Sequence, residues 1–299
     1  MKPAAFEYVA PRSLRKAIQA LAQAGDEGKI LAGGQSLVPM MALRLARPKL
    51  LVDINRIQKL AYISKRNGAL HIGALTRQRE VERSDLVRSV CPLLYEAVPL
   101  IGHIHIRNRG TIGGTLAHAD PAAELPGVAV ALDAALVLEG PRGERTLRAE
   151  EFYLSHYATP VEAGEILKEV RFPPWPQRSG SSFLEVSRRH GDFALAGVAV
   201  RLSLDPDGRL MDPRIAVIAV GATPQRIPKA EGLLRGEMAE DRLFDEAASQ
   251  VSKEIEPESD VHASAEYRRH VAGVLTRRAL RLASERARAK PKGGKGTFV

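Results

Sequence analysis

The 299-residue sequence contains one cysteine, Cys91, and few aromatic residues, which make up 5% of the chain. A single thiol forms no internal disulfide, and it cannot hold an iron–sulfur cluster, because such clusters usually need four thiolates. Cys91 stands in the apolar segment 90–94, which is typical of a small buried core residue rather than of a nucleophile. The scarcity of aromatic side chains also leaves few surfaces on which nucleic-acid bases could stack.

The sequence also lacks long apolar runs and the common nucleotide-binding motifs. No stretch approaches the roughly 20 apolar residues that span a bilayer, and residues 1–6 show no apolar signal-peptide core. We therefore expect no membrane span and a cytoplasmic location. No P-loop motif is present, and no G-x-G-x-x-G follows a predicted strand. ATP binding in a P-loop and the common dinucleotide-binding fold are both disfavoured.

The net charge of +9 is concentrated at one end of the chain. Residues 277–299 hold eight Lys or Arg and one Glu, so this end carries +7 and the first 276 residues carry +2. The excess is a property of a solvated basic end, and we expect no nucleic-acid partner. Residues 289–299 are predicted to form a flexible basic tail.

Apolar periodicity and proline positions predict four segments: an α/β unit at 1–55, an α+β unit at 56–172, a sheet-and-helix domain at 178–288, and the tail. Three prolines at 173–176 separate the second segment from the third. The expected strands lie at 29–31, 50–54, 69–73, 135–138, 182–187, 193–204 and 214–220. The expected helices lie at 12–24, 93–98, 122–131 and 264–288, and Thr76 is expected to cap another helix.

The first glycine-rich segment, Ala32-Gly33-Gly34-Gln35-Ser36, lies between a predicted strand and a predicted helical turn. Glycine allows positive φ and a close approach of the backbone to a ligand. Successive N–H groups in such a turn form a nest that binds an anion, and the Ser36 hydroxyl could reach the same oxygens. An isolated Gly-Gly is more often a plain turn.

A second segment, Thr111-Ile112-Gly113-Gly114-Thr115, again pairs two glycines with hydroxyl groups. Ala117, Asp120 and Glu124 follow it closely. Two phosphate-binding turns suit a dinucleotide diphosphate, with the nearby polar groups left for sugar hydroxyls. The pattern predicts a dinucleotide cofactor bound outside the common dinucleotide fold.

Four motifs together resemble the FAD-binding medium subunit of molybdenum hydroxylases, of the carbon monoxide dehydrogenase and xanthine dehydrogenase type. They are Ala32–Ser36 (AGGQS), Ile106–Asn108 (IRN), Thr111–Gly114 (TIGG) and Asp120–Glu124 (DPAAE). Residues 189–197 resemble the C-terminal domain of that family. The resemblance runs from about residue 3 to about residue 285, with the motifs in the same order.

The resemblance implies an α+β fold: a two-subdomain FAD-binding fold of the vanillyl-alcohol-oxidase/PCMH type, followed by a C-terminal domain with a small antiparallel sheet and helices. It also implies that the two glycine segments hold the FAD phosphates, Glu124 contacts the sugar portion, and Phe193 lies near the flavin ring. Many relatives have Tyr where this chain has Phe193, and Asn or Ser where it has Thr115. The predicted cofactor-binding residues are Ala32, Gly33, Gly34, Gln35, Ser36, Thr111, Gly113, Gly114, Thr115, Ala117, Asp120, Glu124, Asp192 and Phe193.

No catalytic or metal-binding residue is expected in the chain. His103, His105 and His118 form a weak metal pattern, and exposed or flavin-adjacent histidines explain them as well. Asp192 is equally compatible with capping a strand turn and with holding the flavin region.

The implied function is electron transfer. A partner subunit with [2Fe-2S] clusters passes electrons to the FAD held here, and an external small-molecule acceptor takes them away. A large subunit with the molybdenum cofactor oxidises the substrate, in an assembly that is a dimer of heterotrimers. Two alternatives remain: a stand-alone flavin-dependent reductase of the same FAD-binding fold, and a non-catalytic assembly protein.

Overall fold

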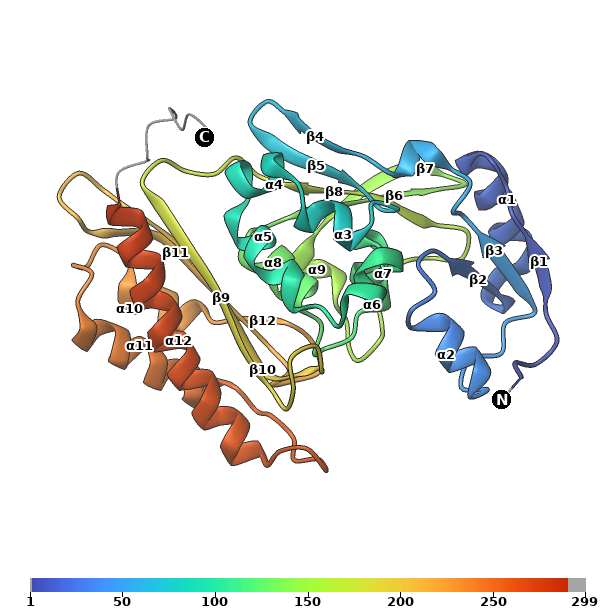
Figure 1. The fold of residues 1–299 in the computed structure, drawn as a ribbon. Helices are drawn as coiled ribbons and strands as arrows, with labels where there is room; N and C mark the ends of the chain where they lie inside the picture. The colour runs from blue at the N-terminus through green and yellow to red at the C-terminus, as the bar shows by residue number, and fades with distance from the viewer. Residues whose placement is uncertain (1, 290–299) are drawn as a thin grey trace, which may run out of the picture.

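The computed structural model describes residues 2–289 and contains three β-sheets that follow one another along the chain (Figure 1). Apart from Ala289, the predicted flexible tail at 289–299 lies outside the described residues. Within the described range, no helix combines the length and the apolar character that a membrane crossing requires.

The first sheet is parallel and has the order β1-β3-β2. Its strands are β1 (Glu7–Val9), β2 (Gly28–Leu31) and β3 (Leu50–Asp53), accompanied by α1 (Leu14–Ala24), a 3₁₀ turn (Gly25–Glu27) and α2 (Leu37–Ala42). Helix α1 buries Ala17, Ile18 and Leu21 against this sheet. Ile18 and Leu21 belong to the apolar stripe that the sequence predicts together with Leu14 and Ala22, but Ala22 is exposed and Ala17 takes its place in the core. Because β2 and β3 are parallel neighbours, their carboxyl ends lie at the same edge, where ligands commonly bind.

The second sheet has five antiparallel strands in the order β4-β5-β8-β6-β7. These are β4 (Ile63–Arg66), β5 (Ala69–Gly73), β6 (Ala135–Gly140), β7 (Gly143–Arg148) and β8 (Ile166–Phe172). Its helices are α3 (Gln78–Glu82), α4 (Asp85–Val90), α5 (Pro92–Ala97), α6 (Ile104–Arg109), α7 (Ile112–His118), α8 (Glu124–Ala131) and α9 (Ala149–Phe152), with 3₁₀ turns at Gln58–Leu60 and Val98–Leu100.

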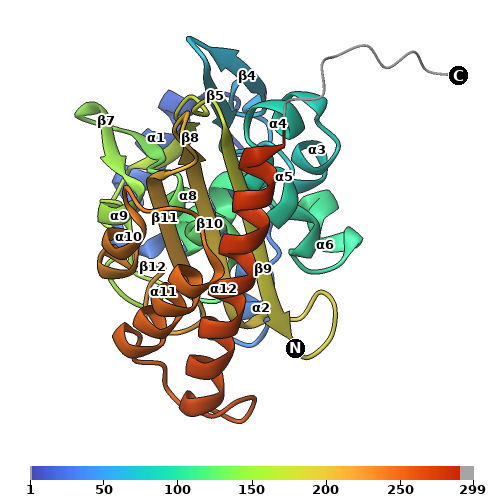
Figure 2. The ribbon, with the colours of Figure 1, turned by 90° about the vertical axis from the view of Figure 1, so that its left-hand side faces the viewer.

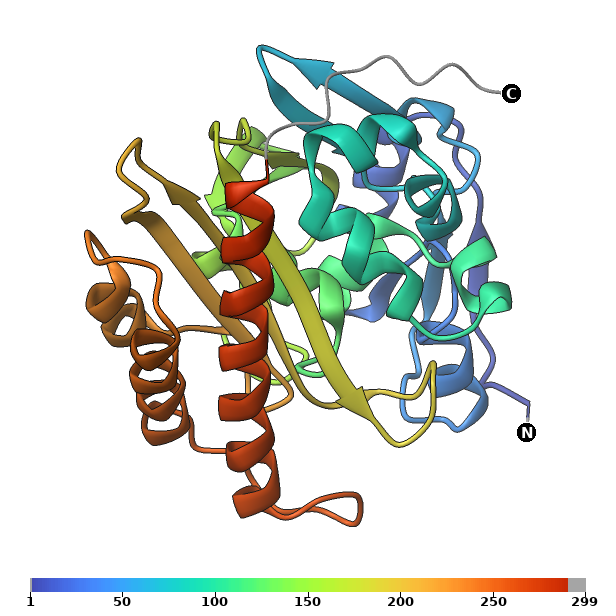
Figure 3. The same ribbon diagram turned by 60° about the vertical axis from the view of Figure 1, so that its left-hand side comes forward.

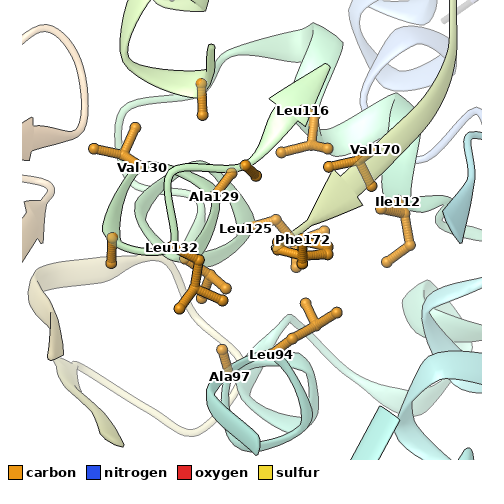
Figure 4. Packing of buried hydrophobic residues seen from close by; sticks show 14 of the residues in the cluster. Leu94, Ala97, Ile112, Leu116, Leu125, Ala129, Val130, Leu132, Val170 and Phe172 are labelled. Atoms are coloured by element: carbon orange, nitrogen blue, oxygen red, sulfur yellow. The ribbon is translucent and has the colours of Figure 1, made fainter. Parts of the chain in front are cut away.

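Helix α8 lies at the centre of the largest apolar cluster. All of its residues are buried, so it is apolar on every side except at its first residue, Glu124. Figure 4 shows Leu125, Ala129 and Leu132 from this segment beside Leu94 of α5 and Phe172 of β8. The helix therefore joins the five-stranded sheet to the helices around it.

The third sheet is antiparallel and has the order β12-β11-β10-β9. Its elements are β9 (Ser179–Ser187), β10 (Ala194–Leu204), β11 (Leu210–Ile218), β12 (Gln225–Arg226), α10 (Pro228–Leu234), α11 (Asp241–Glu254) and α12 (Ala265–Arg288). Helices α11 and α12 cover one face of this sheet, and the central helices pack on the other (Figures 1, 2 and 3). Strand β10 is buried along its whole length because both faces are covered.

The predicted α+β fold with an antiparallel C-terminal sheet is confirmed, and the predicted strands and helices are present with ends shifted by a few residues. The prediction for Thr76 is wrong. The residue before α3 is Arg77, and the buried Thr76 hydroxyl instead donates to the Tyr62 carbonyl at 2.9 Å. A hydroxyl just before a helix can thus form its hydrogen bond with the backbone of another segment rather than with the N–H groups of the helix.

Candidate functional site

The first glycine-rich segment forms the turn between β2 and α2, at the carboxyl end of a parallel strand. Gly34 has φ +75°, in the left-handed region that favours glycine. Among the hydrogen bonds within residues 2–289, none is donated by the backbone N–H groups of residues 33–36. Consecutive free N–H groups of this kind form a nest for an anion.

The two glycine-rich segments meet in space. A Cβ atom at position 33 would overlap the carbonyl oxygen of Arg109, so this contact requires glycine. A Cβ atom at position 114 would lie 3.8 Å from the Cβ of Ala32. The backbone before the second segment and the second segment itself therefore both line the first turn.

The second segment differs from the first, because it is the start of helix α7 rather than an open turn. Thr111 caps the helix, and its Oγ1 accepts from the Gly114 N–H at 3.0 Å. The Ile112 N–H donates a hydrogen bond to the Thr76 carbonyl at 3.0 Å, and the Gly113 N–H donates one to the Ala74 carbonyl at 2.9 Å. These N–H groups are already satisfied, so Gly113 serves the close packing of α7 on Ala74, where a side chain would overlap.

Two residues that the sequence did not single out, Asn55 and Arg77, join the segments. The Asn55 Nδ2 donates to the Ala32 carbonyl at 2.8 Å. Arg77 donates through Nη2 to Asn55 Oδ1 and through Nη1 to the Arg109 carbonyl, both at 2.7 Å. The position of Asn55, directly after a parallel strand next to β2, was the signal that could have identified it.

Arg77 also places positive charge at the turn. Its burial, followed by the nearby charge of Arg109, lowers the pKa of Arg77. Within the part of the chain that the structure describes, the Arg77 guanidinium forms no salt bridge with a carboxylate. The carboxylates of Glu80 and Asp53 act on Arg77 only from a distance, and the Asp53 oxygens accept from Tyr8 at 2.6 Å and from Asn55 at 2.7 Å. A cation without a direct carboxylate partner, beside free N–H groups, favours a bound anion.

The polar residues after α7 lie along the loop that leads into α8. Ala117 is exposed on α7, and Ala119 ends the helix with φ +54°. Asp120 Oδ1 accepts from the Ala122 N–H at 2.9 Å, and its Oδ2 accepts from the Tyr157 hydroxyl at 3.4 Å. Glu124 begins α8 and is only 5% exposed, and this burial raises the pKa of Glu124 to about 8.

Asp192 and Phe193 lie in the turn between β9 and β10, which rests against the loop before α6. A Cβ atom on Gly191 would lie 2.6 Å from the His103 ring, so this turn packs closely on the central part of the protein. Phe193 is 70% exposed, and the Asp192 N–H donates to the Arg189 carbonyl at 3.0 Å. The turn therefore presents a free aromatic ring to its surroundings.

The remaining site residues have separate positions. Thr115 Oγ1 accepts from Gln78 Nε2 at 2.9 Å, while the buried Gln78 Oε1 has no partner. Ser36 precedes α2 without a capping hydrogen bond from its side chain. Across residues 2–289, no group of three His, Cys, Asp or Glu side chains is placed to hold a metal ion.

The fold and the site define an α+β protein with free N–H groups at the end of a parallel strand and a separate C-terminal sheet. Two family matches identify this class as a flavoprotein class. Residues 4–175 match the family described as "FAD binding domain in molybdopterin dehydrogenase", and residues 181–283 match "CO dehydrogenase flavoprotein C-terminal domain". The chain belongs to the family of FAD-binding medium subunits of molybdenum hydroxylases.

Individual relatives cover nearly the whole chain. The 6-hydroxypseudooxynicotine dehydrogenase complex subunit alpha of Paenarthrobacter nicotinovorans is 44% identical, with 96% of this chain and 97% of the relative covered. The carbon monoxide dehydrogenase structure from Hydrogenophaga pseudoflava has a TM-score of 0.93 at 40% identity, covering 96% and 99%. Quinoline 2-oxidoreductase from Pseudomonas putida 86 has a TM-score of 0.91 at 37% identity, with the same coverage.

The cofactor of this family is FAD, as the sequence predicted. The observed residues fit it: the N–H nest and the Arg77 charge suit a diphosphate, and position 33 tolerates no side chain beside the second segment. The protein is thus an FAD-binding subunit of an oxidoreductase.

Proposed function

We propose that FAD binds with its diphosphate on the N–H groups of residues 33–36, under the positive charge of Arg77. Helix α7 then faces the cofactor with Gly114 and the Thr115 hydroxyl, while Thr111, which is only 1% exposed, fixes the start of the helix by capping it. Asp120 and Glu124 serve the sugar hydroxyls. Phe193 lies next to the flavin ring. The meeting of the two glycine segments at Gly33 and Gly114 is the observation that supports this assignment.

The same proposal assigns roles to the three sheets. Units 1–55 and 56–172 hold the cofactor between them, and unit 178–288 closes the site through the turn that carries Asp192 and Phe193. The separate sheets and the contact of Gly191 with His103 support this division.

In the complex, the chain passes electrons from [2Fe-2S] clusters of a small partner subunit through FAD to an external small-molecule acceptor. FAD accepts electrons singly and can release two together, and the protein supplies position and electrostatics. Cys91 supports the assignment of the clusters to a partner subunit. It is the only thiol of the chain, it is 1% exposed, and its burial raises its pKa to about 12. Iron–sulfur clusters therefore belong to another chain.

Substrate oxidation belongs to a large molybdenum-cofactor subunit, in a dimer of heterotrimers located in the cytoplasm. The relatives named as dehydrogenase complex subunits and medium chains support a multi-subunit assembly. Co-purification from the native source, followed by mass measurement of the intact complex, tests this composition.

The first experiment is to purify the chain and record its visible absorbance, then identify the cofactor released by heat. A flavin spectrum with released FAD and no iron supports the proposal, whereas released FMN contradicts the diphosphate assignment. If the protein is colourless, FAD is added back in the presence of the partner subunits. Failure to bind under these conditions would favour the alternative of a non-catalytic assembly protein.

A further inference from the structure

Arg268 is a buried cation on helix α12 that binds the backbone of two other segments. It is only 7% exposed. Its Nη1 donates to the carbonyl of Leu195 at 2.7 Å and to the carbonyl of Ala219 at 3.2 Å, while its Nη2 donates to Asp260 Oδ2 at 2.7 Å. Its buried Nε has no partner within residues 2–289. Because an unsatisfied buried donor is costly, packing alone does not explain an arginine at this position.

Both carbonyl groups belong to residues at which the sheet becomes irregular. The pairing of β10 with β9 shifts register between Ala194 and Ala196, so Leu195 is the extra residue of a bulge. Ala219 directly follows β11 and has φ +60°, in the left-handed region that is costly for residues other than glycine. Arg268 therefore stabilises two points at which the backbone leaves regular strand geometry.

The first of these points leads directly to the turn that carries Phe193. Leu195 follows Phe193 by two residues, and the Phe193 ring is 70% exposed. Within the turn, the Asp192 N–H donates to the Arg189 carbonyl at 3.0 Å. A hydrogen bond to the Leu195 carbonyl fixes the place at which the chain enters β10, and with it the backbone that carries the exposed ring.

The second point reaches the loop that carries Asp120. The Ala219 N–H donates to the Pro121 carbonyl at 2.9 Å, and Pro121 directly follows Asp120. Ala219 is therefore held through its carbonyl by Arg268 and is itself bound to the loop through its N–H. One guanidinium thus connects the turn of Phe193 with the loop of Asp120.

Asp260 keeps the guanidinium in this position. Its Oδ1 accepts from the N–H groups of His262 and Ala263 at 2.8 and 2.9 Å, which fixes the loop before α12. The N–H groups of Ala263 and His262, together with Arg268, lower the pKa of Asp260 to about 2. Asp260 is therefore ionised at neutral pH, and its charge orients Arg268.

A second arginine on α12, Arg286, provides a comparison. It donates to both oxygens of Glu96 and to the carbonyl of Ser181, so it also ties α12 to β9 and to α5. Helix α12 packs along β9 and β10 (Figure 3). Because an α-helix rises about 1.5 Å per residue, the two arginines lie about 27 Å apart and, after about five turns, on the same side of α12. Arg286 thus joins the same helix and sheet far from Phe193.

We propose that Arg268 is a positioning residue of the cofactor site: by binding the carbonyls of Leu195 and Ala219 together, it fixes the turn of Phe193 relative to the loop of Asp120. This role rests on the proposed function, which places Phe193 at the flavin ring and Asp120 at the sugar. Lysine at position 268 keeps the charge, but it lacks the planar fork that reaches both carbonyls and a carboxylate at once.

Hydrogen exchange of the apoprotein tests the positioning without reference to FAD. The full chain is compared as wild type, Arg268→Met, Arg268→Lys and the control Arg286→Met. We expect the Asp192 and Ala219 N–H groups to exchange about tenfold faster in Arg268→Met and about threefold faster in Arg268→Lys, because their segments lose hydrogen bonds to a charged group. Arg286→Met should leave both groups unchanged and speed exchange near Ser181.

Unchanged exchange in the Arg268 variants, or an equal acceleration in Arg286→Met, would overturn the proposal. If Arg268→Met does not fold, Arg268→Lys decides, since it retains a cation beside Asp260.

The second measurement uses the FAD-loaded chain and asks whether Arg268 acts through Phe193. The shift in flavin midpoint potential caused by Phe193→Tyr is measured in the wild-type, Arg268→Lys and Arg286→Met backgrounds. We expect the shift to fall to about half or less in Arg268→Lys and to remain full in Arg286→Met, because coupled residues give non-additive effects. A full shift in Arg268→Lys would overturn the proposal, since an arginine that only stabilises the fold would not alter it.

The two measurements separate this proposal from the proposed function. If FAD does not bind, or if Phe193→Tyr leaves the wild-type flavin unchanged, the placement of the cofactor fails and the positioning role fails with it. If the flavin responds to Phe193→Tyr equally in the wild-type and Arg268→Lys backgrounds, only the positioning role fails.

Discussion

Arg77 donates a hydrogen bond of 2.7 Å to Asn55, a residue on the other side of the first glycine turn. Through this bond the carbonyl groups of Ala32 and Arg109 are held by one continuous network. The network leaves the N–H groups of the turn free while it fixes the carbonyls behind them. Anion binding then needs little reorganisation of the backbone, which is the basis of preorganised binding.

Replacing Arg77 with Gln should weaken FAD binding about 10- to 100-fold, because hydrogen bonds to charged groups contribute about 1.5–3 kcal/mol. Riboflavin, which lacks the diphosphate, should lose little affinity. Flavin fluorescence titrations measure both constants. Arg83→Gln, an exposed change at the end of the same helix, is the control and should bind like wild type. Equal losses for FAD and riboflavin would argue against a diphosphate contact.

Gly33→Ala should lower both stability and FAD affinity. The added methyl group overlaps the Arg109 carbonyl, so the two glycine segments must separate. Gly232→Ala in α10 is the matched control, since nothing lies within 4 Å of its added Cβ. Alanine there should be neutral or should stabilise the helix by up to about 1 kcal/mol. Urea unfolding and FAD titration of both variants provide the comparison, and a normal Gly33→Ala protein would refute the close contact.

Arg226→Met should destabilise the C-terminal sheet by about 3–5 kcal/mol. Arg226 donates to both oxygens of Glu231 at 2.6 Å and to Asp133 at 3.1 Å, and Glu231 is only 2% exposed. Without the guanidinium, a buried carboxylate loses its counter-charge. Chemical denaturation measures the loss. Arg242→Met removes an exposed pair with Glu246 and should cost less than about 0.5 kcal/mol.

Phe193→Tyr should leave stability unchanged but alter the bound flavin. The ring is 70% exposed, so a hydroxyl on it meets no packing restriction in the protein. If the ring lies beside the flavin, the added hydroxyl should shift the flavin absorbance and its midpoint potential. Difference spectra and a redox titration detect these changes. Spectra and potential equal to wild type would place Phe193 away from the cofactor.

Local patterns predicted much of the fold. The apolar stripe of Leu14, Ile18, Leu21 and Ala22 indicated α1, and the long amphipathic pattern at 264–288 indicated α12 (Ala265–Arg288). These predictions succeed because helix periodicity records which side faces a core, wherever that core lies. The prediction that Thr76 caps a helix was wrong because its hydroxyl donates to the Tyr62 carbonyl, and only the folded chain brings this partner near.

The sequence by itself determined the family, the cofactor and the order of the motifs, because glycine pairs and their flanking hydroxyls are local features. It did not determine that the N–H groups of residues 33–36 are free while those of Ile112 and Gly113 are used. Nor did it bring Asn55 to Arg77. These relationships join segments far apart in the chain, and they depend on how sheets and helices pack rather than on any periodicity along the sequence.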